Sequence, residues 1–490
     1  MSKYVLGIDI GTGSCKCCVI TTEGEIICSY SSEYDVNAAE SGSVTQNPKV
    51  WYKAFIDTLK KIKVNLEDIT AVGTTGQMRG LTFIGKDKEV VADSVLWNDT
   101  RCVDEAEMLN RKEYGSIKEI TYNPINTMCT LPKILWTMKH EAKIWNDTYK
   151  FIYPKDYINF ALTGEIATDH SDASGSSVYD FKSKTWSKKI IADFSLGKEK
   201  FPEILNSFEI IGNINEKAAE KTGLKEGIPV VAGGSDATTE LFSIGVVNGK
   251  QCKIRLGSSC GISTVVEEKS YSTAMEHYCW KPVTGEGIVL DINTRFCAQS
   301  VRWLRDVFYN KMPKTGETYQ LIDREAKSVK PGTDGLIFHP YLQGEDAPYW
   351  DMALRGMFSG INAGHQRRHF ARAVFEGVAF SIKDVITTYP EIYDKCEEYK
   401  VIGGGTKSET WLKIIIDVLG KDVILPKKGD AAFGACLIAL IGTADTDIQD
   451  LIEDIVEKDN NVLKPNFQNT EFYNEQFSRY KELTDKILRS

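Results

Sequence analysis

Asp9 is the first residue whose type and position could do chemistry. It lies near the end of an apolar run, residues 5–10, and the turn formers Thr12 and Gly13 follow it. Glycine lets backbone N–H groups approach an anion closely, and hydroxyl groups add further donors. A carboxylate repels phosphate unless a cation such as Mg²⁺ lies between them, and Lys16 supplies another positive charge. The pattern predicts a phosphate and Mg²⁺ hairpin, although an ordinary β-turn after an N-terminal strand explains it equally well.

Asp236 is the second carboxylate at a glycine turn. A short apolar run, residues 228–232, ends in Gly233 and Gly234, and a helical pattern begins at Asp236. Glycine there permits close approach of a substrate and a phosphate, so Asp236 is a candidate general base. An aspartate at a helix start also stabilises the helix by capping it. The sequence leaves both interpretations open.

Side chains after two other predicted strands are candidates for lining a cleft, and one of them could contact a sugar. Gln77, Met78 and Arg79 follow the predicted strand 69–72, and Trp97 follows a shorter apolar segment. Side chains at the carboxyl end of a strand line clefts in α/β folds, and tryptophan can offer its face to the C–H side of a sugar. A surface turn and a core tryptophan are the structural alternatives.

An internal repeat positions these residues. Residues 253–266 repeat the opening strand–turn–strand, residues 398–406 resemble residues 69–76, and residues 422–432 resemble residues 230–238. Three echoes in the same order predict the duplication of one α/β unit. The repeated turns contain Gly257, Ser258, Ser259, Gly403, Gly404 and Gly405.

The glycine turn at residues 403–405 leads into a predicted helix. Thr406 and Glu409 have the spacing of a capping box at its start. Glycines without side chains can leave a slot for a flat base and ribose, and close packing of a helix on a strand is the alternative. In the first half, by contrast, the Ser-, Asp- and Gly-rich residues 169–177 predict an ordered loop.

Length and composition limit the class of protein. A chain of 490 residues predicts two large domains, with residues 1–245 in the first and 246–490 in the second. The net charge of −9 disfavours nucleic acid or an anionic membrane as a partner. The sequence shows no apolar run of about 20 residues, no signal-peptide pattern and no zinc-type cluster among its six histidines. These features, with twelve cysteines and no regular Cys-x-x-Cys pairs, predict a cytoplasmic protein.

The chain resembles the FGGY family of carbohydrate kinases over nearly its full length, most closely the xylulokinase branch. Residues 128–136 (MCTLPKILW) fit one family signature, and residues 356–361 with residues 369–376 fit the other. The resemblance implies two ribonuclease-H-like domains in the actin, hexokinase and Hsp70-like α/β architecture, with a catalytic cleft between them. It also implies ATP and Mg²⁺, a small-molecule sugar substrate and a possible homodimer.

The resemblance also implies roles for particular residues. Asp9 is the Mg²⁺-associated acid and Asp236 the catalytic base, which also touches the sugar. The remaining residues fall into a phosphate hairpin (Thr12, Gly13, Lys16), a sugar side (Gln77, Met78, Arg79, Trp97), a second phosphate turn (Gly257, Ser258, Ser259) and an adenosine turn (Gly403, Gly404, Gly405).

One departure from the family pattern concerns the sugar. Xylulokinases usually carry histidine after the Gln-Met pair, where this chain has Arg79. The expected reaction is phosphorylation of a primary hydroxyl of a ketopentose, D-xylulose first, with ribulose, L-xylulose or another polyol as alternatives. A catalytically silent sugar-binding regulator and a sugar-independent ATPase of the Hsp70 or actin kind are the rivals from other classes.

Overall fold

The computed structural model describes residues 3–271, 277–444, 446–457 and 460–488. It divides into two compact units, which are described separately. Unit 1 comprises Met1–Val247, Val266–Leu290 and Lys428–Lys458, and unit 2 comprises Asn248–Val265, Asp291–Lys427 and Asp459–Ser490. Two segments of the second half of the chain therefore pack with unit 1. The predicted sequence domains, residues 1–245 and 246–490, remain a prediction.

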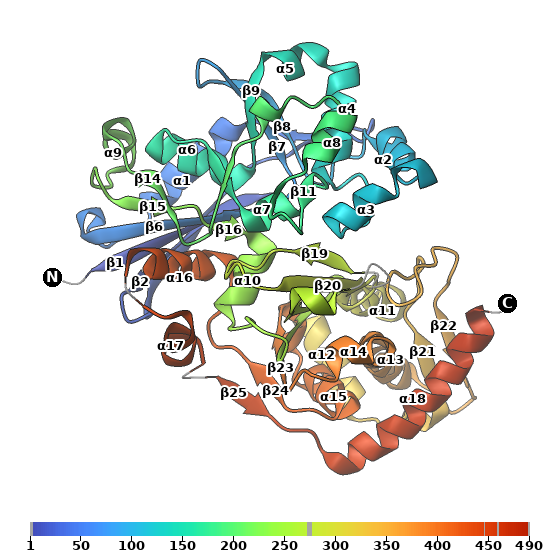
Figure 1. Cartoon of the computed structure of the whole chain (residues 1–490). Coiled ribbons are helices and arrows are strands. Elements are labelled where there is room, and N and C mark those ends of the chain that lie inside the picture. The colour runs from blue at the N-terminus through green and yellow to red at the C-terminus, as the bar shows by residue number, and fades with distance from the viewer. Residues whose placement is uncertain (1–2, 272–276, 445, 458–459, 489–490) are drawn as a thin grey trace. The chain divides into compact units, whose positions relative to one another are not determined.

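The main sheet of unit 1 follows the order β14-β15-β6-β1-β2-β3, and β16 also pairs with β6 (Figure 1). β1 pairs with β2 in antiparallel fashion, and with β6 in parallel. The predicted opening hairpin and the strand that begins at residue 69 are confirmed. The strands are β1 (Tyr4–Ile10), β2 (Ser14–Thr21), β3 (Ile26–Glu33), β6 (Ile69–Gly76), β14 (Ile210–Asn213), β15 (Pro229–Val231) and β16 (Gly234–Ser235).

Alternation along β1 decides which helices cover which face of this sheet. Leu6, Ile8 and Ile10 contribute to a core with α1 (Pro48–Leu59), α6 (Pro154–Thr163) and α9 (Glu216–Thr222). Val5 contributes to a second core on the other face, with α16 (Ala431–Thr443). Gly7 lies on that face too, because a Cβ there would lie 2.1 Å from the carbonyl oxygen of Ala432.

Unit 1 carries a second sheet, β4-β5-β8-β7-β9, with its own core against surrounding helices. Its strands are β4 (Asn37–Ala38), β5 (Val44–Gln46), β7 (Leu81–Gly85), β8 (Val90–Val95) and β9 (Thr148–Ile152). The other elements of unit 1 are α2 (Val103–Leu109), α3 (Ser116–Thr121), α4 (Thr130–His140), α5 (Ala142–Asp147), β10 (Ala167–Asp169), α7 (His170–Ser174), β11 (Tyr179–Asp180), β12 (Thr185–Trp186), α8 (Lys188–Asp193), β13 (Glu203–Leu205), α10 (Asp236–Ser243), β19 (Tyr278–Trp280) and α17 (Ile448–Leu451).

Unit 2 repeats the strand pattern of unit 1. β17 pairs with β18 in antiparallel fashion and with β23 in parallel, and β23 pairs in parallel with β24. This is the pattern of β1 with β2, β6 and β15, so the predicted repeat is confirmed. The strands are β17 (Gln251–Leu256), β18 (Cys260–Val266), β23 (Glu398–Ile402), β24 (Val423–Leu425) and β25 (Asn461–Leu463).

The 22-residue helix α13 (Arg367–Thr388) is largely buried in unit 2. The other elements assigned to this unit are α11 (Ala298–Phe308), α12 (Gly316–Lys327), β21 (Ile337–His339), β22 (Met357–Ser359), α14 (Pro390–Tyr393), α15 (Glu409–Leu419) and α18 (Phe467–Leu488). β20 (Ile288–Thr294) belongs to unit 2 from Asp291 onward.

Two local predictions are wrong. Residues 169–177 do not form a loop, because β10 ends at Asp169 and α7 follows it at once. Asp169 caps α7 by accepting hydrogen bonds from Ser171 N and Asp172 N. Thr406 does not cap α15, because the cap is Ser408, whose side chain accepts from Trp411 N.

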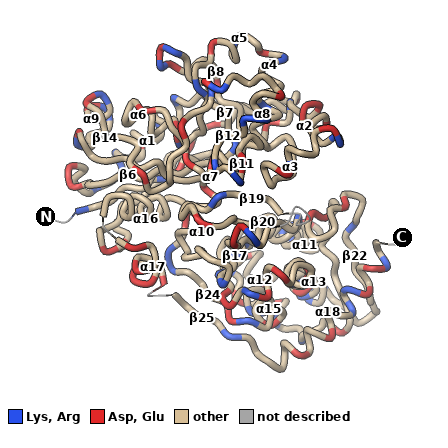
Figure 2. The backbone as a smooth tube through the Cα atoms, in the orientation of Figure 1, with Lys and Arg blue, Asp and Glu red and all other residues tan. Residues whose placement is uncertain are grey.

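Charged residues of both signs are spread along the chain. Lys and Arg are interspersed with Asp and Glu along both units (Figure 2). The expected absence of a nucleic-acid or membrane partner stays a prediction. Within the described part of the chain, none of the helices combines the length and apolarity needed to cross a bilayer.

The close approach of α16 to the sheet generates a stability prediction. A Cβ at Gly73 of β6 would lie 2.0 Å from the carbonyl oxygen of Ala435 in α16. Gly73→Ala should therefore lower the free energy of unfolding by about 1–3 kcal/mol, the usual cost of overpacking. Gly316→Ala is the control, since its Cβ would meet nothing within 4 Å, and it should change stability by less than about 0.5 kcal/mol. Equal thermal unfolding midpoints for the two variants would contradict this packing.

Candidate functional site

Parallel pairing brings three predicted site segments of unit 1 to one edge of the sheet. Ile10 at the end of β1 is in register with Gly76 at the end of β6, and Gly76 is in register with Ser235 of β16. Gln77 follows β6 directly, and its backbone N–H donates to the Ile10 carbonyl at 2.8 Å. Asp9, Gln77 and Asp236 therefore gather where the strands end, the usual binding edge of an α/β sheet.

Asp9 faces the beginning of α16. It lies two residues after Gly7, on the same face of β1. Asp430 caps α16, and Lys16, the register partner of Asp9 on β2, pairs with Asp430 at 2.7 Å. Burial raises the pKa of Asp9 to about 8, and the carboxylates of Asp236 and Asp430 also raise it, while Lys16 opposes them. Negative charge is therefore in excess at this edge.

This environment suits a divalent cation. Oδ1 of Asp9 is buried and has no hydrogen-bond partner. Among the described residues, no three carboxylate, histidine or cysteine side chains form a ready-made metal cage. Mg²⁺ seldom needs one, because it is typically held by one or two carboxylates, water and substrate phosphates. The donor set of Asp9 and its neighbours fits that mode.

Asp236 is the first residue of α10, not its cap. The cap position belongs to Ser235, and Oδ1 of Asp236 accepts from its neighbour Ala237 N at 2.8 Å. Asp236 is therefore not the N-cap, but its carboxylate accepts an N–H of the first turn and stabilises the helix start, as an acidic group there should. Gly233 adopts φ +76°, and a Cβ there would lie 1.9 Å from the Thr74 carbonyl oxygen, so only glycine fits this turn.

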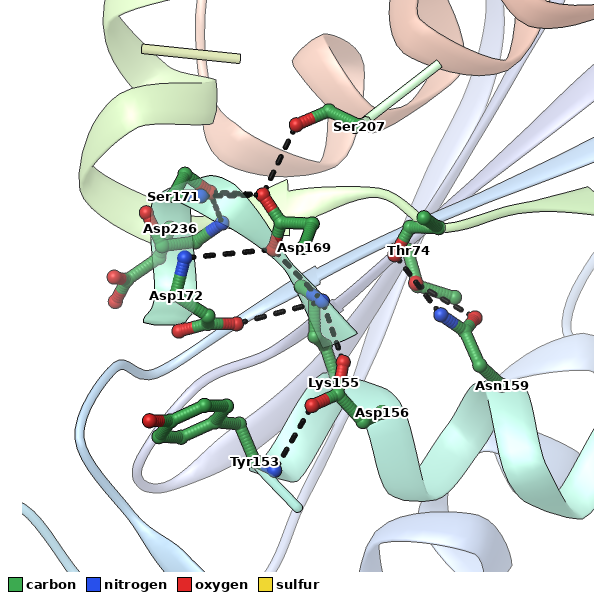
Figure 3. Close-up of polar contacts among 12 residues, drawn as sticks. Thr74, Tyr153, Lys155, Asp156, Asn159, Asp169, Ser171, Asp172, Ser207 and Asp236 are labelled. Carbon is green, nitrogen blue, oxygen red and sulfur yellow. Dashed lines mark hydrogen bonds and ion pairs between the residues drawn. The ribbon is translucent and has the colours of Figure 1, made fainter. Parts of the chain in front are cut away.

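A buried cation organises the side chains behind this turn (Figure 3). Lys155 at the start of α6 is fully buried and pairs with Asp156 at 2.5 Å, Asp169 at 3.0 Å and Asp172 at 3.5 Å. Burial lowers the pKa of Lys155, but the three carboxylates outweigh that effect and raise it. Lys155 therefore stays protonated where water does not reach it. Its charge must be balanced by nearby carboxylates, so the three aspartates are held around it.

Hydrogen bonds extend this arrangement to the residue before Asp236 (Figure 3). Oδ2 of Asp169 accepts from Ser171 Oγ at 2.6 Å and from Ser207 Oγ at 3.0 Å. Ser171 Oγ in turn accepts from Ser235 N at 2.8 Å. The backbone that delivers Asp236 is thus fixed by a buried chain that starts at Lys155.

A second buried residue holds the other end of the same turn. Asn159, also on α6, accepts from Thr74 Oγ1 at 2.8 Å and donates to the Ala232 carbonyl at 2.9 Å (Figure 3). Ala232 immediately precedes the two glycines. α6 therefore anchors the turn on both sides, through Asn159 before the glycines and through Lys155 after them.

Asp172 is the carboxylate around Lys155 whose oxygens are left without hydrogen bonds. It is fully buried, and the ammonium group of Lys155 lies 3.5 Å from Oδ2. Burial raises its pKa well above the usual range, Lys155 opposes the rise, and Asp236 adds to it. Asp172 and Asp236 therefore interact electrostatically.

The predicted phosphate hairpin and sugar side share a hydrogen-bond network. Thr12 Oγ1 donates to Gln77 Oε1 at 3.2 Å and accepts from Trp97 Nε1 at 3.1 Å. Gln46 Nε2 donates to the Thr12 carbonyl at 2.8 Å. Trp97 is 37% exposed, so it is not a core residue. Met78, which follows Gln77 in the sequence, is buried. A Cβ at Gly13 would meet no atom within 4 Å.

In unit 2 the two predicted nucleotide turns lie side by side. Arg255 of β17 is in register with Ile402 of β23, so the turns that follow these strands meet at one edge. A Cβ at Gly403 would lie 2.8 Å from the Leu256 carbonyl oxygen. The carbonyls of Gly257 and Ser258 accept from backbone N–H groups at the start of α11, while Ser259 completes the turn.

A cavity of about 630 Å³ opens beside the glycine turn of unit 2. Gly404 and Gly405 line it, together with Trp411 of α15, whose ring stacks on Phe375 at 5.5 Å. The size is typical of a small-molecule or cofactor site, and an apolar wall next to glycine suits a flat base. The further lining residues include Arg302, Tyr319, Gln320, Asp323 and Ser408.

Sequence reasoning missed the buried network behind Asp236. Lys155, Asp156, Asp169 and Asp172 were visible as charges in segments that otherwise read as helix and strand. Charge inside a buried segment is a signal in itself, because lysine and aspartate are almost never fully buried unless paired. Their partners lie on separate elements, however, and spacing along the chain does not reveal those pairs.

Comparisons with known proteins agree along the whole chain. The N-terminal-domain model of the FGGY family of carbohydrate kinases matches residues 4–243, and the C-terminal-domain model matches residues 252–443. The chain is 29% identical to a xylulose kinase of Bacillus subtilis over 98% of this chain and 96% of that protein. It is 26% identical to a gluconokinase of the same organism over 93% of this chain and 91% of that protein.

A solved structure extends the likeness to the fold. The crystal structure of a "xyloylose kinase" from Brucella ovis superposes with a TM-score of 0.90 at 28% identity, covering 99% of each chain. The predicted two-domain α/β architecture of the actin and hexokinase type is confirmed.

The chain from Lys155 to Ser235 can be tested at Ser171. Ser171→Ala removes the acceptor of the buried Ser235 N–H, and an unpaired buried group costs about 1–3 kcal/mol. We expect a fall of roughly tenfold or more in kcat for sugar-dependent ADP release, because a small misplacement of a reacting group is costly. Ser174→Ala is the matched control, since Ser174 is equally buried on α7 but accepts from Lys281 N instead. Comparable kcat losses in both variants, at equal stability, would remove Ser171 from the positioning of Asp236.

Proposed function

Because the chain belongs to the FGGY family of carbohydrate kinases, we propose that it phosphorylates a primary hydroxyl of D-xylulose with ATP. The family makes it an ATP-dependent sugar phosphotransferase, whose substrates are ATP and a small-molecule sugar. Full-length similarity to xylulose kinases supports the choice of sugar. The observation that carries the proposal is Asp236, a carboxylate at the strand ends of unit 1 whose backbone a buried hydrogen-bond chain holds in place.

Asp236 is the proposed general base. The sugar O–H gives its proton to the carboxylate as the oxygen forms a bond to the γ-phosphorus, and the bond from that phosphorus to the β-bridging oxygen breaks to release ADP. Base help of this kind is worth about 10²–10⁴-fold in rate. Gln77, Met78, Arg79 and Trp97 are the proposed contacts that orient the sugar.

Charge stabilisation is the larger requirement in phosphoryl transfer. Asp9 is the proposed holder of Mg²⁺, and the bound ion would neutralise charge on the transferred phosphoryl group. Thr12, Gly13 and Lys16 form the proposed phosphate hairpin in unit 1. Gly257, Ser258 and Ser259 form the proposed phosphate turn in unit 2, and Gly403, Gly404 and Gly405 border the proposed adenosine site.

Other sugars are the alternatives within the same activity. Ribulose, L-xylulose or another polyol would use the same carboxylate and the same nucleotide turns. The gluconokinase relative shows that the family fold also serves a different substrate. A panel of sugars in a coupled assay separates these candidates, and ADP release without any sugar would favour an ATPase. The homodimer remains a prediction.

Replacing Asp236 tests the general base. Asp236→Asn keeps the shape of the side chain but cannot accept the proton, so kcat should fall about 10²–10⁴-fold with little change in sugar affinity. Asp193→Asn, an exposed carboxylate at the end of α8, is the control and should keep kcat within about fivefold. Steady-state kinetics with D-xylulose decide the matter, and near-wild-type kcat for Asp236→Asn would assign the chemistry to another group.

Replacing Asp9 tests the proposed Mg²⁺ site separately. Asp9→Asn removes the charge that would hold the cation, so the Mg²⁺ concentration for half-maximal rate should rise tenfold or more. Sugar binding without nucleotide, measured calorimetrically, should stay unchanged. An unchanged Mg²⁺ requirement would show that phosphates and water alone hold the ion.

A further inference from the structure

Arg79 is a buried cation that the proposed reaction does not explain. Its side chain is only 6% exposed, and its backbone has φ +63°, a region that residues other than glycine rarely adopt. Strained backbone of this kind persists where surrounding structure enforces it and is found at binding sites. Arg79 follows β6 directly after Gln77 and Met78, among the proposed sugar contacts.

The guanidinium of Arg79 presents an empty hydrogen-bonding edge. Both Nε and Nη2 are buried without a hydrogen-bond partner. The N–H bonds of these two nitrogens point the same way in the guanidinium plane, and together they make the fork that binds a carboxylate side-on. Elsewhere in unit 1 this fork is occupied, since Arg101 directs Nε and Nη2 to the carboxylate of Asp99 at 3.0–3.1 Å.

The aromatic residues around Arg79 stabilise its positive charge but accept no hydrogen bond from Nε or Nη2. Its guanidinium carbon lies 5.2 Å from the ring centroid of Tyr278 and 5.7 Å from that of Trp280, and the two rings are nearly parallel. Aromatic faces stabilise a cation but accept no in-plane hydrogen bonds. The fully buried Lys133 also interacts electrostatically with Arg79, and its ammonium group donates to the backbone carbonyls of residues 127, 128 and 129.

Arg79 and Asp236 follow strands that end at the same edge of the sheet, because Gly76 of β6 is in register with Ser235 of β16. A Cβ on Gly175, which ends α7, would lie 3.5 Å from Arg79 Cγ. Asp236 interacts with Asp172 near the start of the same helix.

We propose that the sugar site of this kinase accepts aldonic acids, with the carboxylate on the Nε–Nη2 fork of Arg79 and the terminal hydroxyl at Asp236. The inference rests on the proposed function, since it uses the same site and the same base. A carboxylate satisfies both N–H groups and the buried charge at once, whereas the carbonyl of a neutral ketose satisfies at most part of the fork. The transfer itself is unchanged: the terminal hydroxyl gains the phosphoryl group and loses its proton to Asp236.

The matched pair of substrates is D-xylonate and D-xylulose. Both have five carbon atoms, and the only primary hydroxyl of D-xylonate is at the end opposite its carboxylate. We expect D-xylonate to be phosphorylated with a kcat/KM at least equal to that of D-xylulose, measured by coupled ADP release. D-gluconate, one carbon longer, tests the length of the site.

Variants of Arg79 separate charge from geometry. Arg79→Lys keeps a cation but loses the fork, so kcat/KM for D-xylonate should fall roughly 10- to 100-fold, a larger loss than the one for D-xylulose. Arg79→Asn removes the charge and tolerates positive φ, so it tests the same point if the lysine variant folds poorly. Arg101→Lys is the control, because its fork already belongs to Asp99, and it should leave the ratio of the two substrates unchanged.

The outcomes distinguish this inference from the proposed function. Turnover of D-xylulose with no turnover or binding of either aldonate would overturn the assignment of the fork while leaving the xylulose kinase intact. Equal losses for both substrates in Arg79→Lys would likewise overturn it. ADP release that no sugar stimulates would contradict the proposed function itself.

Discussion

The buried ammonium group of Lys155 is the constraint on which the arrangement of unit 1 depends. It cannot be solvated, so three carboxylates must remain around it, and each carboxylate belongs to a segment that must then stay in place. Through Asp169 and Ser171 this requirement reaches the backbone N–H of Ser235, one residue before Asp236. An ion pair inside a fold adds little net stability by itself. Here it contributes position, which is what the proposed general base, Asp236, needs.

The strand ends of unit 1 carry an excess of negative charge. Asp9, Asp236 and Asp430 gather there, and Lys16 pairs with Asp430 at 2.7 Å. Burial and mutual repulsion make this arrangement unfavourable when nothing is bound, as the raised pKa of Asp9 shows. A divalent cation relieves the repulsion, and so the same carboxylates that weaken the empty fold favour the metal-bound state of a phosphoryl-transfer enzyme. Arg79 is a buried positive group in a similar situation, because its Nε and Nη2 have no hydrogen-bond partner.

The sequence predicted the features that depend on local pattern. Residues 5–10 alternate and end in a turn, so the opening hairpin and its repeat at β17 and β18 could be read directly. The position of Asp236 at a glycine turn was equally visible. Residues 169–177 were misread, because their polar composition resembles a loop and only burial beside Lys155 makes them strand and helix. The cap at Ser408 was missed because Thr406, two residues earlier, also offers a hydroxyl group, and spacing does not decide between them. The pairing of Lys16 with Asp430 was missed because the two residues are far apart in the sequence.

One measurement bears most directly on the claim that Asp236 takes the proton of the sugar. A crystal structure of the enzyme with D-xylulose and a non-hydrolysable ATP analogue would give the distance between the Asp236 carboxylate and the primary hydroxyl. The account predicts hydrogen-bond contact, about 2.6–3.2 Å, directly or through one water molecule. A sugar bound with that hydroxyl against another carboxylate, and Asp236 in contact with neither the sugar nor a bridging water, would contradict it.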